Sequence, residues 1–256
     1  MNKQLSPGTV VLVGGGPGDA DLLTVAGMRA VRQADVILYD RLAPQDALAE
    51  ARPDAELVPV GKWPRGEYTP QEEINRLLVE HARAGRRVVR LKGGDNTVFG
   101  RGGEEAQACV AAGVPVEFVP GVTSAVAAPQ LAGIPVTHRS LSQGFTVVSG
   151  HVPPGDARSQ LDWGALARTR TTLVILMGVK YLPEITATLR DAGLDPTTPA
   201  AIVMAACMPG SQTLRGTVSS IADIAGQQGV TPPAITVIGD VAALDLTDAD
   251  LAGLDA

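Results

Sequence analysis

The sequence is poor in the residue types that several common kinds of site require. Only 3% of its 256 residues are aromatic, which disfavours a protein that binds nucleic acid by stacking bases on rings. Its cysteines, Cys109 and Cys207, are far apart, and its three histidines are scattered, so we expect neither a disulfide framework nor a metal site. Basic residues are also in the minority. The net charge of −6 argues against nucleic acid or an anionic membrane as a partner.

Long apolar runs are missing as well. No stretch approaches the roughly 20 apolar residues that span a bilayer, and the first residues lack the apolar core of a signal peptide. We therefore expect a cytoplasmic protein. Hydrophobic residues make up 45% of the chain, which is ample for a packed core.

What the sequence does have is an alternation of apolar strands with amphipathic helices. Because strands joined through helices pair in parallel, this pattern predicts an α/β protein with a mostly parallel sheet in its first half and a second βα series after it. We expect two α/β domains, 1–130 and 131–256, with a linker over 131–143 and a loose tail over 245–256. The expected strands cover residues 9–13, 35–40, 57–62, 87–92, 114–119, 145–149, 172–177, 200–204, 212–217 and 234–238. We expect a helical stretch after Arg41 through Ala51, and in the second half helices over 183–190 and 219–225.

The most informative stretch runs from residue 87 to residue 105. It reads as a strand that enters a glycine-rich bend at Gly93 and Gly94, followed by a helix with Glu104 and Glu105 in its first turn. Five glycines fall within the eleven residues 93–103, among charged side chains. This composition favours a ligand-binding loop over a purely structural turn.

Other strand-end loops also carry glycine or charge. In a parallel sheet these loops share one edge, so we expect them to converge on one cleft, closed by the second domain. The charged residues of these loops include neither a Ser/His/Asp arrangement nor a metal-binding cluster. This favours transfer chemistry with a bound cosubstrate over hydrolysis. The loops are 14–19, 40–41, 61–62, 93–95 and 177–178.

Several longer motifs add up to a resemblance that covers residues 8–244. The motifs are GGGPGD at 14–19, YDRL at 39–42, VGK at 60–62, PQEEIN at 70–75, RLKGGD at 90–95, VFGRGGEE at 98–105, PGVTSA at 120–125 and AGIPVTHR at 132–139. With these motifs the chain resembles the uroporphyrinogen-III C-methyltransferases of the tetrapyrrole methylase superfamily.

This resemblance implies two α/β domains with S-adenosylmethionine in the cleft between them, and a homodimer. It also implies two methyl transfers to uroporphyrinogen III, which give precorrin-2 via precorrin-1 on the route to sirohaem, cobalamin or haem d1, with S-adenosylhomocysteine as the other product. Donor contacts are implied, by motif, for Pro17, Gly93, Gly94, Asp95, Val98, Thr123, Ser124, Met177, Ala206 and Ala234.

The same resemblance implies roles for charged residues. Arg101, Arg139 and Arg41 are expected to bind the acidic side chains of the macrocycle, because guanidinium groups hold carboxylates bidentately. Glu104 matches a proposed proton acceptor, and Asp40 and Lys62 match positions treated as acid and base, with Arg101 also in the catalytic group. Glu105 is expected to serve only the helix start.

The chain departs from the usual family pattern at two places. Asn96-Thr97 stands where Pro-Phe is common, and the segment from Met204 to Ala206 is apolar, so donor contacts there are expected to differ. Other readings stay open: another precorrin or non-tetrapyrrole methylase of the superfamily, or a binding protein that keeps the fold. A nicotinamide-dependent oxidoreductase is disfavoured, because Pro17 removes a backbone donor and Asp19 would repel a pyrophosphate.

Overall fold

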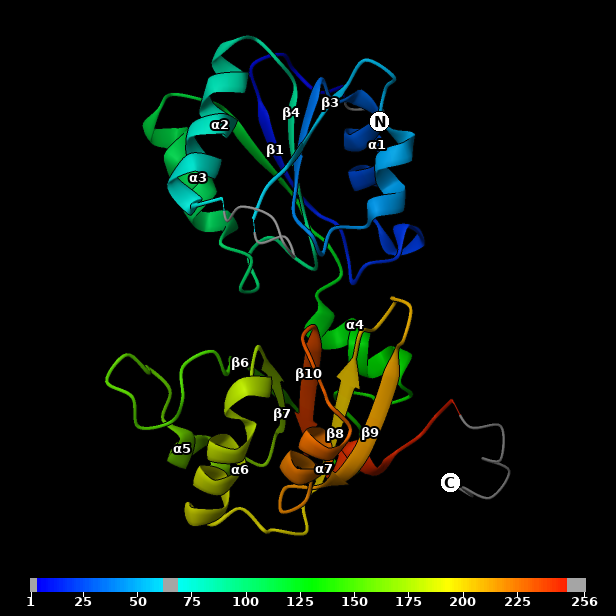
Figure 1. Ribbon diagram of the computed structural model, residues 1–256, viewed down its shortest axis with the longest axis vertical. Helices are drawn as coiled ribbons and strands as arrows, with labels where there is room; N and C mark the ends of the chain where they lie inside the picture. Colours follow the sequence, from blue (N-terminus) through cyan, green and yellow to red (C-terminus); the bar gives the residue numbers. More distant parts are fainter. Residues whose placement is uncertain (1–3, 62–68, 248–256) are drawn as a thin grey trace. The chain divides into compact units, whose positions relative to one another are not determined.

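The computed structural model describes residues 4–61 and 69–247. The chain forms two compact units, Met1–Ser124 and Ala125–Ala256, each with its own sheet (Figure 1). The predicted α/β class is confirmed. The division falls earlier than the expected one after residue 130, because helix α4 (Ser124–Leu131) packs Ala125 and Ala128 into the apolar core of the second unit.

The first unit contains a five-stranded, wholly parallel sheet in the order β3-β2-β4-β1-β5. All residues of β1 and β4 are buried, as expected for the centre of a sheet covered on both faces. The shared direction places the carboxyl ends of all five strands at one edge. The strands are β1 (Val10–Gly14), β2 (Val36–Tyr39), β3 (Glu56–Pro59), β4 (Val88–Lys92) and β5 (Val116–Val119).

Helices cover both faces of this sheet (Figure 1). Helices α2 (Gln71–Arg83) and α3 (Gly102–Ala111) lie on one face, and α1 (Val25–Gln33) lies on the other. The segment expected to be helical after Arg41 forms the 3-10 helix η2 (Gln45–Glu50), and a further 3-10 turn, η1 (Ala20–Leu22), precedes α1.

The second sheet is mixed, in the order β6-β7-β10-β8-β9. Strand β6 (Phe145–Ser149) is parallel to β7 (Thr172–Leu176), whereas β8 (Pro199–Met204), β9 (Gln212–Thr217) and β10 (Ala234–Ile238) pair antiparallel with their neighbours. Because β10 runs opposite to β7 and β8, its first residue lies beside their last ones.

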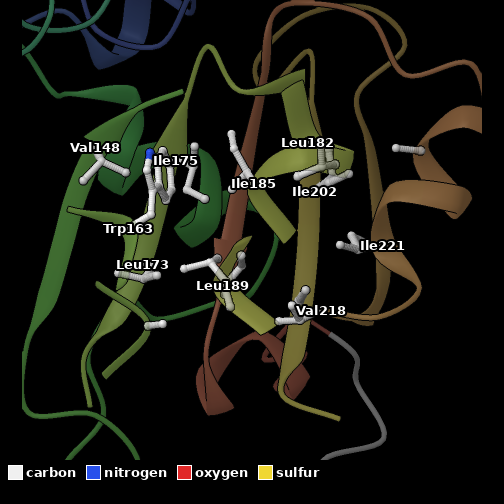
Figure 2. Close-up of a cluster of buried hydrophobic side chains, with 14 of the residues drawn as sticks. Val148, Trp163, Leu173, Ile175, Leu182, Ile185, Leu189, Ile202, Val218 and Ile221 are labelled. Atoms are coloured by element: carbon white, nitrogen blue, oxygen red, sulfur yellow. The ribbon is translucent and has the colours of Figure 1, made fainter. Parts of the chain in front are cut away.

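Besides the apolar cluster that α4 joins, the second unit has another between this sheet and its other helices (Figure 2). Trp163 and Leu189 are almost completely buried, and Ile175 of β7 packs with them. Helices α6 (Leu182–Asp191) and α7 (Ile221–Gln227) agree with the expected ones, but α5 (Trp163–Arg168) was not predicted. The 3-10 turns η3 (Val179–Tyr181) and η4 (Asp240–Ala243) complete the unit.

The expected loose tail is partly attached. Asp245 pairs with Arg215 at 3.1 Å, and the Leu246 N–H donates to the Gly133 carbonyl at 3.0 Å. Residues 248–256 lie outside the described part of the chain. Within the residues that are described, none of the helices has the length and apolar character needed to cross a bilayer.

Candidate active site

Glycine-bearing bends meet at the carboxyl edge of the first sheet. The bend after β1 and the bend after β4 form a small antiparallel bridge, in which the Gly94 N–H donates to the Gly16 carbonyl at 2.6 Å and the Gly16 N–H donates back at 3.1 Å. The Gly15 N–H donates to the Lys92 carbonyl at 2.7 Å. These hydrogen bonds hold the end of β1 against the end of β4.

The bend after β5 packs against the same bridge, backbone to backbone. A Cβ on Gly121 would lie 2.4 Å from the Gly94 carbonyl oxygen, and a Cβ on Gly14 would lie 2.5 Å from the Gly121 nitrogen. Real Cβ atoms essentially never approach another heavy atom within 3.0 Å. These positions therefore require glycine, and peptide groups rather than side chains form this part of the edge. Ser124 joins the group, with its nitrogen 3.7 Å from the Cβ position of Gly94.

Asp95 shapes the loop that follows Gly94. Its Oδ1 accepts hydrogen bonds from the Thr97 N–H (2.8 Å), the Thr97 hydroxyl (2.7 Å) and the Val98 N–H (3.3 Å), and its Oδ2 accepts from the Gly121 N–H (3.1 Å). Burial by itself raises the pKa of this carboxyl, but the hydrogen bonds outweigh it and hold the pKa below the ordinary value. Asp95 therefore stays charged and fastens the loop to the β5 bend.

Asn96 fastens the same loop to the sheet itself. Its side chain is 1% exposed, and its Nδ2 donates to the carbonyl oxygens of Leu12 (3.0 Å) and Val119 (2.9 Å). Its own carbonyl accepts from the Gly102 N–H at 2.9 Å, at the start of α3. The departure from the usual Pro-Phe pattern thus gives the loop an anchor of another kind.

Asp40 also acts on a glycine bend. Its Oδ1 accepts from the N–H groups of Leu42 (3.1 Å) and Gly93 (3.2 Å), and its Oδ2 lies 3.6 Å from Nη2 of Arg90. These contacts hold the β2 end against the β4 end. Arg41, next in sequence, is partly buried. Lys62 lies outside the described residues.

Arg101 and Glu104 form a bidentate ion pair at the start of α3. Arg101 Nε and Nη2 donate to the two Glu104 oxygens at 2.9 and 2.6 Å, and the side chains are 49% and 53% exposed. The hydrogen bond from Arg101 holds the pKa of Glu104 below its ordinary value. Glu104 is therefore a weak base while the pair is intact, and a proton-acceptor role requires the pair to open.

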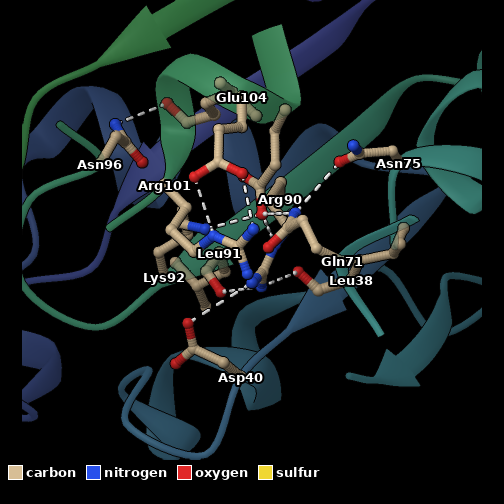
Figure 3. A network of polar contacts seen from close by, with 12 residues as sticks. Leu38, Asp40, Gln71, Asn75, Arg90, Leu91, Lys92, Asn96, Arg101 and Glu104 are labelled. Atoms are coloured by element: carbon tan, nitrogen blue, oxygen red, sulfur yellow. Dashed lines mark hydrogen bonds and ion pairs between the residues drawn. The ribbon is translucent and has the colours of Figure 1, made fainter. Parts of the chain in front are cut away.

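Glu105 has a different environment from its neighbour Glu104, whose pair with Arg101 is drawn in Figure 3. It is completely buried, and its Oε1 receives Lys92 Nζ at 2.7 Å and Arg90 Nε at 3.1 Å. The expectation that Glu105 serves only the helix start is wrong. The available signal was the pair of cations two residues apart in an otherwise apolar strand, because buried cations require a counter-ion.

Left-handed backbone conformations gather near the predicted site residues. Among the described residues, those other than glycine with positive φ are Phe99, Arg101, Met177, Ala205 and Cys207. Such conformations cost about 1–3 kcal/mol each and often mark binding sites. Arg101 and Met177 are predicted site residues, and Phe99, Ala205 and Cys207 each lie beside one in the sequence. Sequence motifs did not indicate this strain.

In the second unit, the predicted donor residues collect at one edge of the sheet. Met177 follows β7, Ala206 follows β8, and Ala234 opens β10 opposite Met204. Arg139 does not join them. It is exposed in a turn whose last residue, Ser142, accepts from the N–H of Thr172 at the opposite end of β7 (3.1 Å). In the part of the chain that the structure describes, no group of three or more His, Cys, Asp or Glu could hold a metal ion.

Comparison with known proteins relates this architecture to one family. The model of the tetrapyrrole (corrin/porphyrin) methylases matches residues 9–222. The chain is 46% identical over 250 residues to the S-adenosyl-L-methionine-dependent uroporphyrinogen III methyltransferase of Methanosarcina barkeri, covering 97% of this chain and 98% of that protein. A crystal structure of uroporphyrin-III C-methyl transferase from Thermus thermophilus, complexed with S-adenyl homocysteine, gives a TM-score of 0.77 at 44% identity, covering 91% of this chain and 98% of the other.

Other relatives are longer than this chain. A siroheme synthase of Neisseria meningitidis is 48% identical over 237 residues, which are 93% of this chain but only 48% of that protein. The chain thus spans about half the length of the siroheme synthases that it matches. On the family match and the full-length relatives, the chain belongs to the tetrapyrrole (corrin/porphyrin) methylases.

Proposed function

We propose that the chain transfers methyl groups from S-adenosylmethionine to two carbon atoms of uroporphyrinogen III, giving precorrin-1 and then precorrin-2. The observation that carries this proposal is the junction of the bends after β1, β4 and β5, packed without room for a side chain, whose loop after Gly94 leads into the Arg101–Glu104 pair at the start of α3. The names of the full-length relatives support both the donor and the substrate class.

For the donor, we assign small residues and peptide groups at the edges of both sheets. In the first unit, Asp95 has its oxygens engaged by the Thr97 and Gly121 groups, so its main role is to shape the turn that presents Gly93 and Gly94. The proposed donor contacts remain those of the motif: Pro17, Gly93, Gly94, Asp95, Val98, Thr123, Ser124, Met177, Ala206 and Ala234.

The reaction is a displacement at the sulfonium methyl. An electron-rich pyrrole carbon forms the new C–C bond, the S–CH₃ bond breaks, and the electron pair stays on sulfur as S-adenosylhomocysteine leaves. The pyrrole nitrogen supplies the electron density, so no strong base is needed for attack. Most of the rate then comes from alignment of the two atoms at about 3 Å.

Arg101 is proposed to bind an acetate or propionate group of the macrocycle. A substrate carboxylate that takes over the guanidinium would release Glu104 from its pair. The pKa of Glu104 would then return toward the ordinary value, because the hydrogen bond from Arg101 is what lowers it. Substrate binding would in this way supply the acceptor for the proton that is later lost. The roles of Arg41, Arg139, Asp40 and Lys62 stay predictions.

The test is to incubate the protein with S-adenosylmethionine labelled in the methyl group and uroporphyrinogen III, and to follow the product by mass and absorption spectra. We expect two labelled methyl groups per macrocycle, as in precorrin-2. Donor binding without transfer to this substrate would favour a methylase that acts on another precorrin or another acceptor. Absence of donor binding would remove the proposal.

A nicotinamide-dependent oxidoreductase is less consistent with the geometry. The N–H groups of Gly15 and Gly16 are both used within the chain, and Pro17 has none. The first glycine turn therefore has few backbone donors left for a pyrophosphate. A titration that compares S-adenosylhomocysteine with NAD decides between the two, and tighter binding of NAD would favour the oxidoreductase.

The resemblance also implies a homodimer and a cytoplasmic location, and both stay predictions. Light scattering coupled to gel filtration measures the mass in solution. A mass equal to one chain of 26.4 kDa across the working concentration range would contradict the dimer.

A further inference from the structure

Glu105 is the centre of a buried polar cluster that joins three elements of the first unit. Its partners Arg90, Lys92 and Gln71 are labelled in Figure 3. Besides Lys92 and Arg90 of β4, its Oε1 receives Nε2 of Gln71 from α2 at 3.3 Å. All four side chains are at least nine-tenths buried. Its Oε2 has no hydrogen-bond partner within the described residues, so Glu105 contributes through its charge and through one oxygen.

The charges of this cluster balance only if Glu105 is included. Arg90 and Lys92 contribute two positive charges, and Glu105 and Asp40 contribute two negative ones. Burial lowers the pKa of Lys92, the neighbouring Arg90 charge lowers it further, and the Glu105 carboxylate opposes both. Removing one partner of a buried pair leaves an uncompensated charge, which is strongly destabilising.

The cluster reaches the glycine bends through two contacts. Arg90 lies 3.6 Å from Asp40, and Asp40 accepts the Gly93 N–H at 3.2 Å. The Lys92 carbonyl accepts the Gly15 N–H at 2.7 Å. The side chains that Glu105 holds therefore belong to the strand end from which both bends are fixed.

We propose that Glu105 is a positioning residue: its charge holds Arg90 and Lys92 and, through Arg90 and Asp40, fixes the Gly93 turn in the conformation that binds the methyl donor. This role rests on the proposed function for the identity of the ligand. The role of Glu105 is distinct from that of Glu104, which is exposed and pairs with Arg101.

The first test is Glu105→Gln, which keeps the shape of the side chain and removes its charge. We expect the Kd of S-adenosylhomocysteine, measured by calorimetry, to rise about tenfold or more, because the turn loses its support. We also expect faster amide hydrogen exchange in the peptide that contains Gly93. The matched control is Glu72→Gln, an exposed carboxylate in the first turn of α2, which should leave both quantities unchanged.

The second test restores the balance of charge. In the double variant Lys92→Met with Glu105→Gln, one positive and one negative charge leave together, and the amide oxygen introduced by the second substitution can still accept from Arg90. We expect the Kd to return to within about threefold of the parent value, because a balanced cluster no longer strains the turn. The double variant also tests the positioning role of Glu105 if Glu105→Gln alone does not fold.

Specific results would overturn the positioning role. A folded Glu105→Gln protein with parental donor affinity and parental exchange at Gly93 would show that the carboxylate supports only overall stability. A folded double variant that binds the donor no better than Glu105→Gln, or not at all, would do the same. Failure of the parent itself to bind S-adenosylhomocysteine would instead remove the proposed function, and exchange at Gly93 would still decide whether Glu105 fixes the turn.

Discussion

The two units hold their candidate binding bends by different means. In the first unit, buried or partly buried side chains fasten the bends: Asp40 holds Gly93, Asp95 holds Gly121, and Asn96 bonds to β1 and to the end of β5. In the second unit, backbone groups make the corresponding contacts. The Gly150 N–H donates to the Leu176 carbonyl and the Ala205 N–H to the Pro233 carbonyl, both at 2.8 Å.

This difference indicates which substitutions should alter the binding edge of each unit. Three polar side chains and a charged cluster determine the geometry of the first unit's edge, so single changes there should alter it. Steric fit determines the second unit's edge, where a Cβ on Gly178 would lie 2.8 Å from Cγ2 of Ile175. A side-chain methyl group is held less firmly than a peptide group.

The largest expected effect is that of Gly121→Ala. The new methyl group would lie 2.4 Å from the Gly94 carbonyl oxygen, so the β4 and β5 bends must separate. We expect a loss of about 3 kcal/mol in the free energy of unfolding, measured with urea, together with loss of donor binding. Gly178→Ala should cost less, because Ile175 can shift.

Gly103→Ala is the control for this comparison. Gly103 lies in α3 and nothing would come within 4 Å of its Cβ. We expect this variant to gain about 0.5–1 kcal/mol, since alanine favours the helix. If Gly121→Ala and Gly178→Ala proved equally costly, the contrast between rigid and yielding neighbours would be wrong.

The next effect is that of Asn96→Ala. The buried carbonyl group of Leu12 and the partly buried one of Val119 would each lose a donor, and we expect the free energy of unfolding to fall by about 2–3 kcal/mol. Donor affinity should fall as well, because the loop loses its anchor. Gln107→Ala, at an exposed position of α3, is the control and should be neutral. Parental stability in Asn96→Ala would mean that water replaces the amide.

A smaller effect is expected on the free energy of unfolding at low pH. Hydrogen bonds from Arg87 and the charges of Arg87 and Arg52 hold the pKa of Asp35 well below its ordinary range. A lowered pKa in the folded state contributes stability that is present above the unfolded pKa and is lost as the pH falls toward the folded one. Asp35→Asn should therefore cost about 2 kcal/mol at neutral pH and progressively less in acid.

Unfolding by urea at several pH values measures this difference. The curves of the parent and of Asp35→Asn should converge below the ordinary pKa of an aspartate. In the second unit, the lowered pKa of Asp195 comes from Thr197 on an exposed turn, so Asp195→Asn should change the pH profile little. A large pH effect there would mean that a carboxylate on an exposed turn contributes as much to acid sensitivity as Asp35 does.

The smallest effect on stability is expected from Arg101→Ala. Exposed ion pairs contribute about 0–1 kcal/mol, so the midpoint of thermal unfolding should barely move. Turnover should nevertheless fall strongly if Arg101 binds the macrocycle, with a rise in KM for the substrate and little change in donor affinity. Unchanged turnover with a folded protein would remove Arg101 from the site.

Much of the first unit could be predicted from sequence, because short apolar runs rich in β-branched residues, such as Val10–Gly14, favour buried strands over helices. The direction of β10 could not, since an apolar run reads the same both ways. Helix α5 was missed because it has only six residues, although Asp162 caps it by accepting from the Ala165 N–H at 2.8 Å.

The candidate site was predicted from motifs, and the structure brings many of its members together in each unit. What the sequence could not separate was Glu104 from Glu105: both lie in one helical turn, and only the position of α3 over β4 decides which one faces Arg90 and Lys92. The position of Arg139 could not be predicted either, because the sequence does not indicate which end of β7 its turn contacts.

The bidentate pair of Arg101 with Glu104 bears on selectivity. An incoming anion must displace a planar carboxylate that already satisfies two guanidinium donors, so only a group of matching fork geometry competes on equal terms. Chloride and other spherical ions would be poor competitors. If Arg101 binds the macrocycle as proposed, Glu104 occupies the place of a substrate carboxylate in the free protein, and chloride salts should inhibit it far less than small dicarboxylates do.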